Sequence, residues 1–430
     1  MSASFATVVS QSLSQLRQAK SPELPEFARS RVERFYTDRV AASWGGRHIL
    51  RGVKPEANAL MLQSNDYLAI TRHPEIVEAQ RQALSTAGNG MMMSAIFMQQ
   101  DDEPIHVLER ELAMAVRTED AILCQSGYVA NVGLVQSLAG ERTPVYIDML
   151  AHTSLWEGIK SAGAQSVPVF HNDPDYLERQ ILRHGPGVVM VDSVYSTNGS
   201  VCPLVEFADI ANRHGCVFIV DESHSLGTHG LNGEGLVASL GLNDRVHFIT
   251  ASLAKAYCAR AGLIACSRRF KQYFGFESLP AIFSSALLPH ELAGIEAAHH
   301  VIVSEGWRRA RLRHVTQRIR QGLTELGYPI GEGTEQIVAL EVGSESAVMQ
   351  VRDAFEAEGI FGAIFCAPAT AKNRALLRLT LHAGLTDADV QHLIDAAARI
   401  RHHVNLEDWS ATRRARRGLT KEAAPIVEVA

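Results

Sequence analysis

The chain has 430 residues, of which 46% are hydrophobic and 20% charged, so it is long enough for one large domain and a smaller second one. Its formal net charge of −6, from 41 Lys and Arg against 47 Asp and Glu, argues against nucleic acid as a partner. No stretch reaches the roughly 18 apolar residues of a membrane-spanning helix, and the start lacks the basic and apolar pattern of a secretory signal. We therefore expect a soluble, cytoplasmic protein with no membrane span.

The six cysteines are scattered along the chain, and no two of them form a CxxC pair. This pattern predicts reduced thiols, and it favours neither a disulfide framework nor a zinc site. We accordingly expect no bound metal.

The hydrophobic pattern divides the chain into three parts. Residues 1–60 are polar and interrupted by proline, which predicts a partly helical N-terminal arm. Residues 61–300 predict a large α/β domain, and residues 301–430 predict a smaller α+β domain. At the far end, a basic run from Arg413 to Arg417 is interpreted as a solvent-exposed tail.

Short, continuously apolar runs dominate the large domain, as in strands that are buried on both faces of a parallel sheet. Between two of them, residues 203–215 place Leu204, Phe207 and Ile210 on one helical stripe that begins at a proline and ends at a glycine. This is a β-α-β unit, and it predicts a mainly parallel, seven-stranded sheet. The seven runs are AILCQS, PVYIDML, SVPVF, GVVMVDSVYS, CVFIVDES, VHFITAS and GLIACS.

Beyond residue 300 the pattern changes. A long charged helix is predicted over residues 305–326, and it is followed by strands over residues 336–342 and 375–382.

Ligand sites in open α/β sheets gather beyond the carboxyl ends of the strands, so the residues at those positions are candidates for chemistry. Each has an ordinary structural alternative: a strand-end Asp often caps a helix, a lone His is often structural, and most lysines reach solvent. Their joint occurrence at one sheet edge nevertheless favours an active site. The candidates are Ser126, Gly127, Tyr128, His152, Ser196, Asp221, His224, Ser252 and Lys255.

Lys255 is flanked by small and apolar residues, and such a setting favours the neutral amine that forms a Schiff base with an aldehyde. The set suits pyridoxal 5′-phosphate (PLP), which requires a carboxylate at its pyridine nitrogen. Asp221 fits that contact, His152 fits stacking on the ring, and His224 with Ser196 fits the ring oxygen. The helix start at Ser126, Gly127 and Tyr128, together with the Ser252 hydroxyl, fits the phosphate.

The order of motifs from about residue 60 to 395 resembles the α-oxoamine synthases, which are fold-type-I PLP enzymes that join an amino acid to an acyl-CoA with loss of carbon dioxide. The motifs are SNDYLAI, QSGYVANVG, DMLAHTSLWEG, VDSVYSTNGSVCPL, VDESHSLGTHG, TASLAKA, IFSSALLP and LLRLTLH. The resemblance implies that Lys255 forms the Schiff base. It also implies that Asn65 and Arg378 bind the amino-acid carboxylate.

The same resemblance implies a homodimer with shared active sites, in which Ser284 and Ser285 contact the phosphate of the partner chain. Lys255, His152, Asp221 and His224 are then the expected catalytic residues.

Within this family the chain is most similar to bacterial synthases of α-hydroxyketone quorum-sensing autoinducers. The resemblance implies condensation of a small L-amino acid, such as 2-aminobutyrate or an S-adenosylmethionine-like donor, with a medium- or long-chain acyl-CoA to an α-aminoketone. The alternative is an α-oxoamine synthase of biotin, aminoketone or sphingoid-base biosynthesis that uses alanine, glycine or serine. A non-catalytic partner subunit is disfavoured because such subunits lack the Schiff-base lysine.

The segment GNGMMMSAIFMQQDD stands where the family usually has a turn rich in Gly and Ser. Its apolar residues Met91–Met93, Ile96 and Phe97 either line a channel for a long acyl chain or belong to the core.

Overall fold

The computed structural model describes residues 21–415, and these form two compact units, residues up to Arg51 and residues from Gly52 onward. In the first unit, α2 (Glu26–Arg34) continues directly into the π-helix η1 (Phe35–Ser43). The ring of Phe35 packs edge-on against Trp44, with the ring centroids 5.7 Å apart. An arm with helical structure was the expectation for this part of the sequence.

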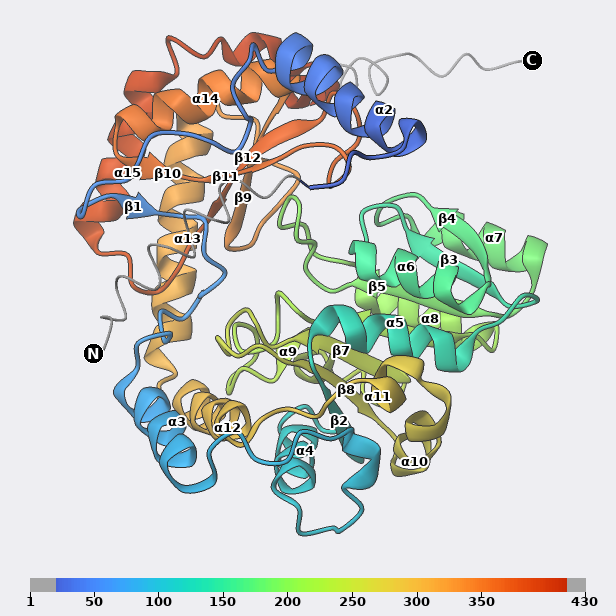
Figure 1. Ribbon diagram of the computed structural model, residues 1–430. Helices are drawn as coiled ribbons and strands as arrows, with labels where there is room; N and C mark the ends of the chain where they lie inside the picture. The colour runs from blue at the N-terminus through green and yellow to red at the C-terminus, as the bar shows by residue number, and fades with distance from the viewer. Residues whose placement is uncertain (1–20, 416–430) are drawn as a thin grey trace, which may run out of the picture. The chain divides into compact units, whose positions relative to one another are not determined.

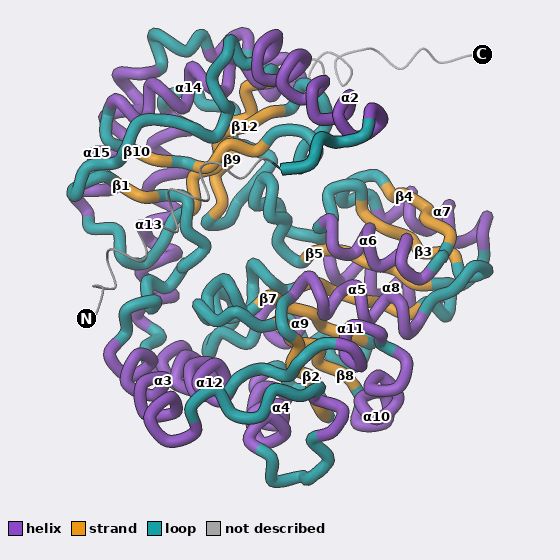
Figure 2. Tube along the Cα trace, viewed as in Figure 1, coloured by secondary structure: helices purple, strands orange, loops and turns teal. Residues whose placement is uncertain are grey.

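The second unit contains a seven-stranded sheet in the order β2-β8-β7-β6-β5-β3-β4, and β8 is its only antiparallel strand (Figures 1 and 2). Every apolar run that was predicted to be a strand of this sheet is one, so the prediction of a mainly parallel, seven-stranded α/β sheet is confirmed. The strands are β2 (Asp120–Cys124), β3 (Pro144–Asp148), β4 (Gln165–Val169), β5 (Val188–Asp192), β6 (Val217–Asp221), β7 (Phe248–Ser252) and β8 (Gly262–Cys266).

Helices cover both faces of this sheet because successive strand residues alternate between two buried clusters. Met190 and Ile219 belong to the cluster that includes residues of α5, α6 and α10, whereas Val189 and Val220 belong to the cluster that includes residues of α4, α7 and α8. The helices are α4 (Pro104–Ala115), α5 (Gly127–Leu138), α6 (Thr153–Ala162), α7 (Pro174–His184), α8 (Leu204–Arg213) and α10 (Arg268–Glu277).

The remaining elements before residue 305 surround this core. They are α3 (Pro74–Ala87), η2 (Ala95–Phe97), α9 (Gly235–Ser239), α11 (Leu279–Phe283) and α12 (Pro289–Ser304).

A second, antiparallel sheet in the order β11-β12-β9 follows the long helix α13 (Trp307–Glu325). Both the long charged helix and the two expected strands are thus present. Short strand β1 (Leu60–Met61) pairs with β10 and so joins the start of this unit to its C-terminal part. The elements are β9 (Ile337–Gly343), α14 (Glu345–Ala357), β10 (Ile360–Phe361), β11 (Ala363–Phe365), β12 (Ala375–Thr380), α15 (Asp387–Ile400) and η3 (Leu406–Asp408).

Within the described residues, no helix is both long enough and apolar enough to cross a lipid bilayer.

Gly262 lies at the sheet edge that carries the candidate residues, and this position has no room for a side chain. It pairs with Cys124 on one side and Ser252 on the other. A Cβ atom here would lie 2.3 Å from the carbonyl oxygen of Ser126 and 2.7 Å from the backbone nitrogen of Gly127. The first turn of α5 can therefore sit directly on β8 only because residue 262 is glycine.

Gly262→Ala should destabilise the fold by about 1–3 kcal/mol, the usual cost of overpacking, because the backbone at Ser126 cannot retreat without moving α5. Chemical denaturation of the variant and the parent measures this change. Gly140→Ala is the matched control, since a Cβ at Gly140 meets no described atom within 4 Å. Equal stabilities for both variants and the parent would contradict the close-approach argument.

Candidate active site

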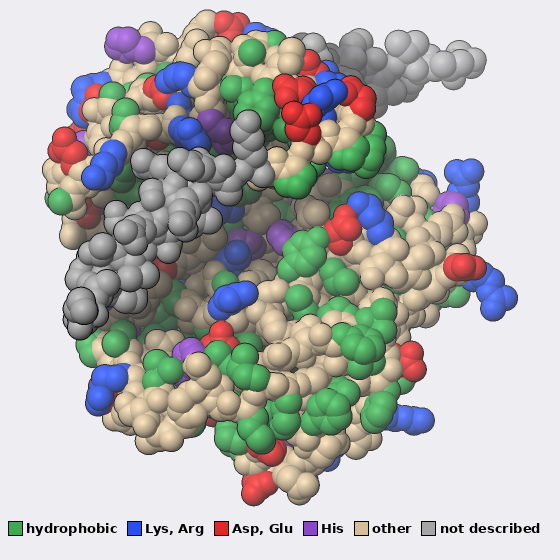
Figure 3. All heavy atoms as spheres, in the orientation of Figure 1, with side chains coloured by type: hydrophobic (Ala, Val, Ile, Leu, Met, Phe, Trp, Pro, Cys, Tyr) green, Lys and Arg blue, Asp and Glu red, His purple; other side chains and the backbone are tan. Residues whose placement is uncertain are grey.

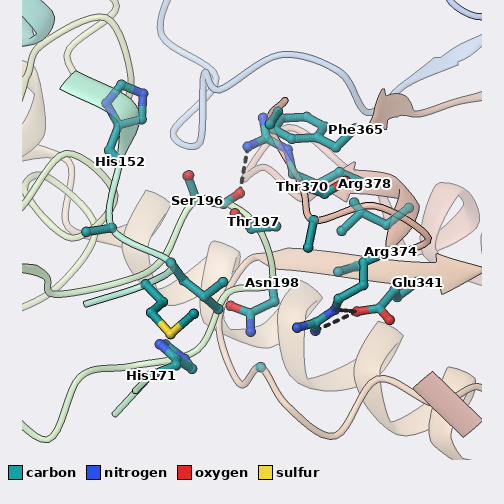
Figure 4. Close-up of a pocket in the computed structure, with 18 of the residues that line it drawn as sticks. His152, His171, Ser196, Thr197, Asn198, Glu341, Phe365, Thr370, Arg374 and Arg378 are labelled. Atoms are coloured by element: carbon teal, nitrogen blue, oxygen red, sulfur yellow. Dashed lines mark hydrogen bonds and ion pairs between the residues drawn. The ribbon is translucent and has the colours of Figure 1, made fainter. Parts of the chain in front are cut away.

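The candidate residues come together because the carboxyl ends of β2, β3, β5, β6 and β7 share one edge of the large sheet. A cavity of about 860 Å³ lies at this edge and reaches residues of the second sheet. Six of the expected site residues line it: Asn65, His152, Ser196, His224, Lys255 and Arg378 (Figure 4 labels three of them, His152, Ser196 and Arg378).

Asp221 ends β6 and is buried, with its carboxylate fixed by two hydrogen bonds. Its Oδ2 accepts from Asn131 Nδ2 at 2.7 Å, and its Oδ1 accepts from the backbone N–H of Ser223 at 2.8 Å. The same Nδ2 atom of Asn131 is 2.9 Å from the Ser154 hydroxyl. Asp221 therefore does not cap a helix; it is a buried carboxylate held in one orientation by α5 and by the turn that follows β6.

His152 follows β3 and is the N-cap residue of α6, where its Nδ1 accepts from the backbone N–H of Ser154 at 3.3 Å and lies 2.7 Å from the Ser154 hydroxyl. Surrounding protein and Lys255 lower the pKa of its imidazole, and Asp221 opposes this shift. The ring is nevertheless exposed on its cavity side. A neutral, flat ring held at one face of the cavity suits stacking.

Lys255 lies in the loop between β7 and β8, half-buried on the cavity wall. Burial lowers the pKa of its ammonium group, and the positive charge of Arg378 lowers it further, while Asp221 acts in the opposite direction. The loop thus holds an amine that loses its proton more readily than an exposed lysine does.

His224 lies in the turn after β6 and is buried. Its Nδ1 is 2.5 Å from the hydroxyl of Tyr67, and Tyr67 also donates to Asn65 Oδ1 at 3.4 Å. Burial, with Lys255 and Arg378 nearby, holds the pKa of this imidazole well below its ordinary value. His224 is therefore neutral at physiological pH and can donate or accept one hydrogen bond on the cavity side.

Arg378 comes from β12 of the second sheet and is buried. Its Nη1 donates to the carbonyl oxygen of Ser196 and its Nη2 to Asn65 Oδ1, each at 2.9 Å, and its guanidinium lies 4.5 Å from the ring centre of Phe365 (Figure 4). Its Nε atom is buried and has no hydrogen-bond partner among the described residues. Each Nη atom keeps a second N–H, so the group retains capacity to bind an anion.

A compact cradle forms where α5 begins. Ser126 caps the helix, its hydroxyl accepting from the N–H of Val129 at 3.2 Å, as the sequence predicts for a turn that opens a helix. A Cβ at Gly127 would lie 2.6 Å from Cβ of Ser252, so only glycine lets the helix start approach β7 so closely. Tyr128 is the next residue, and its ring lies edge-on to His152 with the centroids 6.4 Å apart.

Ser284 and Ser285 follow α11 and do not line this cavity. Gln125 donates through Nε2 to the carbonyl oxygen of Ser285, so Ser285 lies next to the residue that precedes the cradle.

The interpretation of the basic C-terminal run as a solvent-exposed tail holds for Arg413, which is exposed, but is wrong for Arg414. Arg414 is half-buried, lines the cavity and pairs with Glu332 at 2.7 Å and with Glu341 at 2.5 Å. The segment is anchored one turn earlier by Trp409, which is buried against Tyr328. Arg416 and Arg417 lie outside the described residues.

No residue of the methionine-rich segment lines this cavity, and none of the five apolar residues Met91–Met93, Ile96 and Phe97 is fully buried. Met91, Met92 and Phe97 are 71%, 69% and 68% exposed. Ile96 lines a separate cavity of about 790 Å³ beside β2 and α10. The channel interpretation is therefore limited to that second cavity.

Three residues that complete the site escaped the sequence reasoning: Tyr67, Asn131 and Ser154. All three lie within the motifs SNDYLAI, QSGYVANVG and DMLAHTSLWEG. The contacts that Tyr67 and Asn131 make join elements that are distant in sequence. Asn131 is the clearest case, because it sits one turn into a helix and looks like an ordinary helix residue until β6 is placed beside it.

The donor set fits PLP. A buried, hydrogen-bonded carboxylate, a lysine with a lowered pKa, a flat imidazole and a helix start that closely approaches β7 all lie at one sheet edge. Asn131 Oδ1 is also buried and without a hydrogen-bond partner among the described residues. Fold and site together define a fold-type-I PLP-dependent enzyme.

Comparison with known proteins places the chain more narrowly. Residues 57–396 match the family model for class I and class II aminotransferases. A CAI-1 autoinducer synthase of Vibrio campbellii is 42% identical over 90% of this chain and 98% of its own length. An 8-amino-7-oxononanoate synthase of Saccharophagus degradans is 30% identical over 88% of this chain and 96% of its own length. The chain belongs to the class I and class II aminotransferase family and, within it, to the α-oxoamine synthases, which are PLP-dependent acyltransferases.

Solved structures agree on the fold. The serine palmitoyltransferase of Sphingomonas wittichii superposes with a TM-score of 0.81 at 24% identity, over 90% of this chain and all of that one. A variant of an enzyme abbreviated SPT, solved with PLP, superposes with a TM-score of 0.79 at 24% identity, over 89% of this chain and 99% of that one.

The electrostatics at Lys255 predict a pH effect. Only the neutral amine attacks an aldehyde, and Arg378 helps to keep the pKa of Lys255 low. Arg378→Gln should therefore raise this pKa and move the midpoint of PLP capture by the cofactor-free protein to higher pH. Absorbance of the bound cofactor across a pH series measures the midpoint.

The matched control is Arg374→Gln, which removes an arginine from the same cavity wall. Arg374 is paired with Glu341 at 2.7 Å, so its loss should leave the midpoint in place. If the pH midpoint shifted equally in both variants, or moved to lower pH in Arg378→Gln, Arg378 would not be the group that lowers the pKa of Lys255.

Proposed function

We propose that the enzyme condenses a small L-amino acid, 2-aminobutyrate or an S-adenosylmethionine-like donor, with a medium- or long-chain acyl-CoA. Carbon dioxide is lost, and the product is an α-aminoketone precursor of an α-hydroxyketone autoinducer. The observation that carries this proposal is the near full-length similarity to a CAI-1 autoinducer synthase. It is supported by a cavity that, at about 860 Å³, has room for more than one small amino acid.

Bound PLP supplies an electron sink for the pair of electrons that remains when a bond at the amino-acid α-carbon breaks. Lys255 would hold the cofactor covalently and, once released, remove the α-proton as a free amine with a lowered pKa. Asp221 would contact the pyridine nitrogen, and His152 would stack on the ring. His224 and Ser196 would bind the ring oxygen.

The phosphate would lie in the cradle at the start of α5. Backbone N–H groups at a helix N-terminus favour an anion, and the chain approaches closely there because residues 127 and 262 are glycines. Ser126, Gly127, Tyr128 and Ser252 are the residues that we assign to this contact.

Arg378 and Asn65 would bind the amino-acid carboxylate. The guanidinium is oriented by the Ser196 carbonyl, by Asn65 and by the ring of Phe365, so little rotamer freedom is lost when an anion binds. Holding the carboxylate would fix the orientation of the bonds at the α-carbon and so would determine which proton Lys255 can remove.

We also propose a homodimer in which Ser284 and Ser285 contact the phosphate bound by the partner chain. Apolar side chains gather near these serines: Phe283 is 81% exposed, and Phe276 on α10 is 79% exposed. The bridge between Ser94 and Ser285 brings the exposed residues Met91, Met92 and Phe97 to the same region. Figure 3 shows hydrophobic side chains on the face that carries α5, α10 and α11. An exposed apolar patch of this kind favours a second subunit.

Sedimentation velocity of the parent and of Phe283→Glu tests whether the chain forms a dimer through this apolar surface. The parent should sediment as a dimer and the variant as a monomer, since a carboxylate cannot be buried in an apolar interface without a partner. A monomeric parent would contradict the dimer. Phe170→Glu is the control, because Phe170 is also exposed but belongs to the opposite edge of the sheet, next to β4.

Two further proposals concern organisation. We propose a large domain over residues 61–300 and a small domain over residues 301–430, supported by the location of the seven strands within residues 120–266 and of the second sheet within residues 337–380. Strand β1 and helix α12 each cross one of the two boundaries, and the division into compact units falls earlier, between Arg51 and Gly52. We also propose a cytoplasmic location, supported by the scattered cysteines, of which Cys124, Cys202, Cys216, Cys258 and Cys266 form no disulfide with another described residue.

The second candidate function is that of an α-oxoamine synthase in biotin, aminoketone or sphingoid-base biosynthesis, acting on alanine, glycine or serine. It is supported by the similarity to an 8-amino-7-oxononanoate synthase over most of both chains. Both candidates use the same site residues and differ only in the two substrates.

Incubation of the PLP-loaded enzyme with a panel of amino acids and acyl-CoAs, with product masses as the readout, separates the two functions. We expect an aminoketone from 2-aminobutyrate or S-adenosylmethionine with an acyl-CoA of medium or long chain, and no product from Lys255→Ala. Turnover restricted to alanine, glycine or serine would favour the second candidate. Product from Lys255→Ala at the parent rate would contradict both.

A further inference from the structure

The loop between β5 and α8 carries three consecutive residues of the cavity wall: Ser196, Thr197 and Asn198 (Figure 4). It is a tight turn in which the N–H of Tyr195 donates to Ser200 O and the N–H of Gly199 donates to Tyr195 O, both at 2.9 Å. Ser196 and its contact to Arg378 belong to the site described above. Asn198 and the groups behind it have no role there.

A chain of hydrogen bonds supports this loop from the large sheet, and its middle member, His171, is half-buried and lines the cavity. Asp148, at the end of β3, lies 3.0 Å from Nδ1 of His171, and Nε2 of His171 lies 2.9 Å from the hydroxyl of Ser200. Asp148 also accepts from the backbone N–H of Leu150 at 2.8 Å and of Asn172 at 2.9 Å. The carboxylate, and through it the imidazole, is therefore fixed.

The order of Asp, His and Ser is that of a nucleophilic triad, but Ser200 cannot act as a nucleophile. It is only 5% exposed and does not line the cavity. Its hydroxyl is enclosed between His171 and the side chain of Asn198, 2.8 Å away. The chain therefore serves to position the next group along, which is Asn198.

The contacts of Ser200 determine which way the Asn198 amide points. Oδ1 of Asn198 accepts from the backbone N–H of Ser200 at 3.1 Å and from the Ser200 hydroxyl at 2.8 Å. The backbone N–H of Ser200 can only donate, so an amide turned the other way would set the Nδ2 group against this donor. Nδ2 is consequently left as a hydrogen-bond donor at the cavity wall, and it has no acceptor among residues 21–415.

We propose that Asn198 Nδ2 donates to the carbonyl oxygen of the acyl-CoA thioester and stabilises the negative charge that develops there, an inference that rests on the proposed acyltransfer function. A fixed donor aimed at a developing oxyanion is effective because it need not reorganise during the reaction. Ser200, His171 and Asp148 are positioning residues for this donor.

The step balances as follows. The electron pair left by removal of the α-proton forms a bond from the amino-acid α-carbon to the thioester carbon, and the C=O π pair moves to the oxygen. When that pair returns, the carbon–sulfur bond breaks, and CoA leaves as a thiolate that takes up one proton. Loss of carbon dioxide and protonation of the α-carbon then give the α-aminoketone. Asn198 contacts only the oxygen that gains and then returns the pair.

The test compares Asn198→Asp with Asn198→Ala in the PLP-loaded full-length enzyme. The aspartate keeps an acceptor for both Ser200 donors, so it preserves the loop but removes the donor. Both variants should lose about 10²-fold in kcat/KM for acyl-CoA, the usual effect of removing one oxyanion donor. The KM for the amino acid should stay within about threefold, whereas Arg378→Gln should raise that KM and thereby show the opposite pattern.

A binding readout avoids dependence on turnover. Calorimetry with S-(2-oxoalkyl)-CoA, which keeps a carbonyl but cannot be cleaved, should show about tenfold weaker binding to Asn198→Asp than to the parent. S-alkyl-CoA, which lacks the carbonyl, should bind both proteins equally. Ser137→Ala is the matched control: it removes a buried hydroxyl that bonds only to Leu134 O, and it should change neither readout.

If Asn198→Asp kept the parental kcat/KM for acyl-CoA, the inference would be wrong. A rise confined to the KM for the amino acid would also overturn it, because Asn198 would then bind the amino-acid carboxylate. Failure of the proposed function is a different result: the parent itself would form no ketone from any acyl-CoA. Ser200→Ala should lie between the parent and Asn198→Asp, because Oδ1 then keeps one of its two donors.

Discussion

The site depends on the buried carboxylate of Asp221. Burial and the charge of Arg378 lower the pKa of Lys255, whereas the negative charge of Asp221 raises it. Hydrogen bonds from Asn131 and from the backbone N–H of Ser223 hold Asp221 in place. Burying charged groups is costly unless an opposite charge compensates them, so Asp221 offsets part of the cost of burying Lys255 beside Arg378. The large sheet supplies it at the carboxyl end of β6 and supplies Lys255 after the neighbouring strand, β7. The remainder of the architecture brings Arg378 to the same place from β12.

Much of this could be predicted from the sequence. All seven strands of the large sheet were identifiable because strands that are buried on both faces appear as continuous apolar runs, and chemistry-bearing residues that follow such runs must share an edge. Asp221, His224, Ser196 and Lys255 follow directly. The resemblance to α-oxoamine synthases added Asn65 and Arg378, which lie far apart in the chain and meet at 2.9 Å.

What sequence reasoning missed depends on contacts between distant elements. Asn131 is an unremarkable helix residue until α5 packs on β7 and β8, and Tyr67 meets His224 across 157 residues of chain. The tail was misjudged for the same reason: Arg413 to Arg417 look like a solvated basic run, but buried Trp409 turns the segment back so that Arg414 reaches the cavity. Composition and periodicity report burial along an element, and neither reports which distant surface that element will cover.

The central claim is that Lys255, and no other lysine, forms the covalent link to the cofactor. Borohydride reduction of the PLP-loaded enzyme, followed by peptide mass mapping, tests it directly. We expect one modified peptide, which contains Lys255, and we expect Lys255→Ala to lose both the cofactor absorbance band and that label. A protein that stays colourless with added PLP and carries no modification at Lys255, or a label on a different lysine, would contradict it.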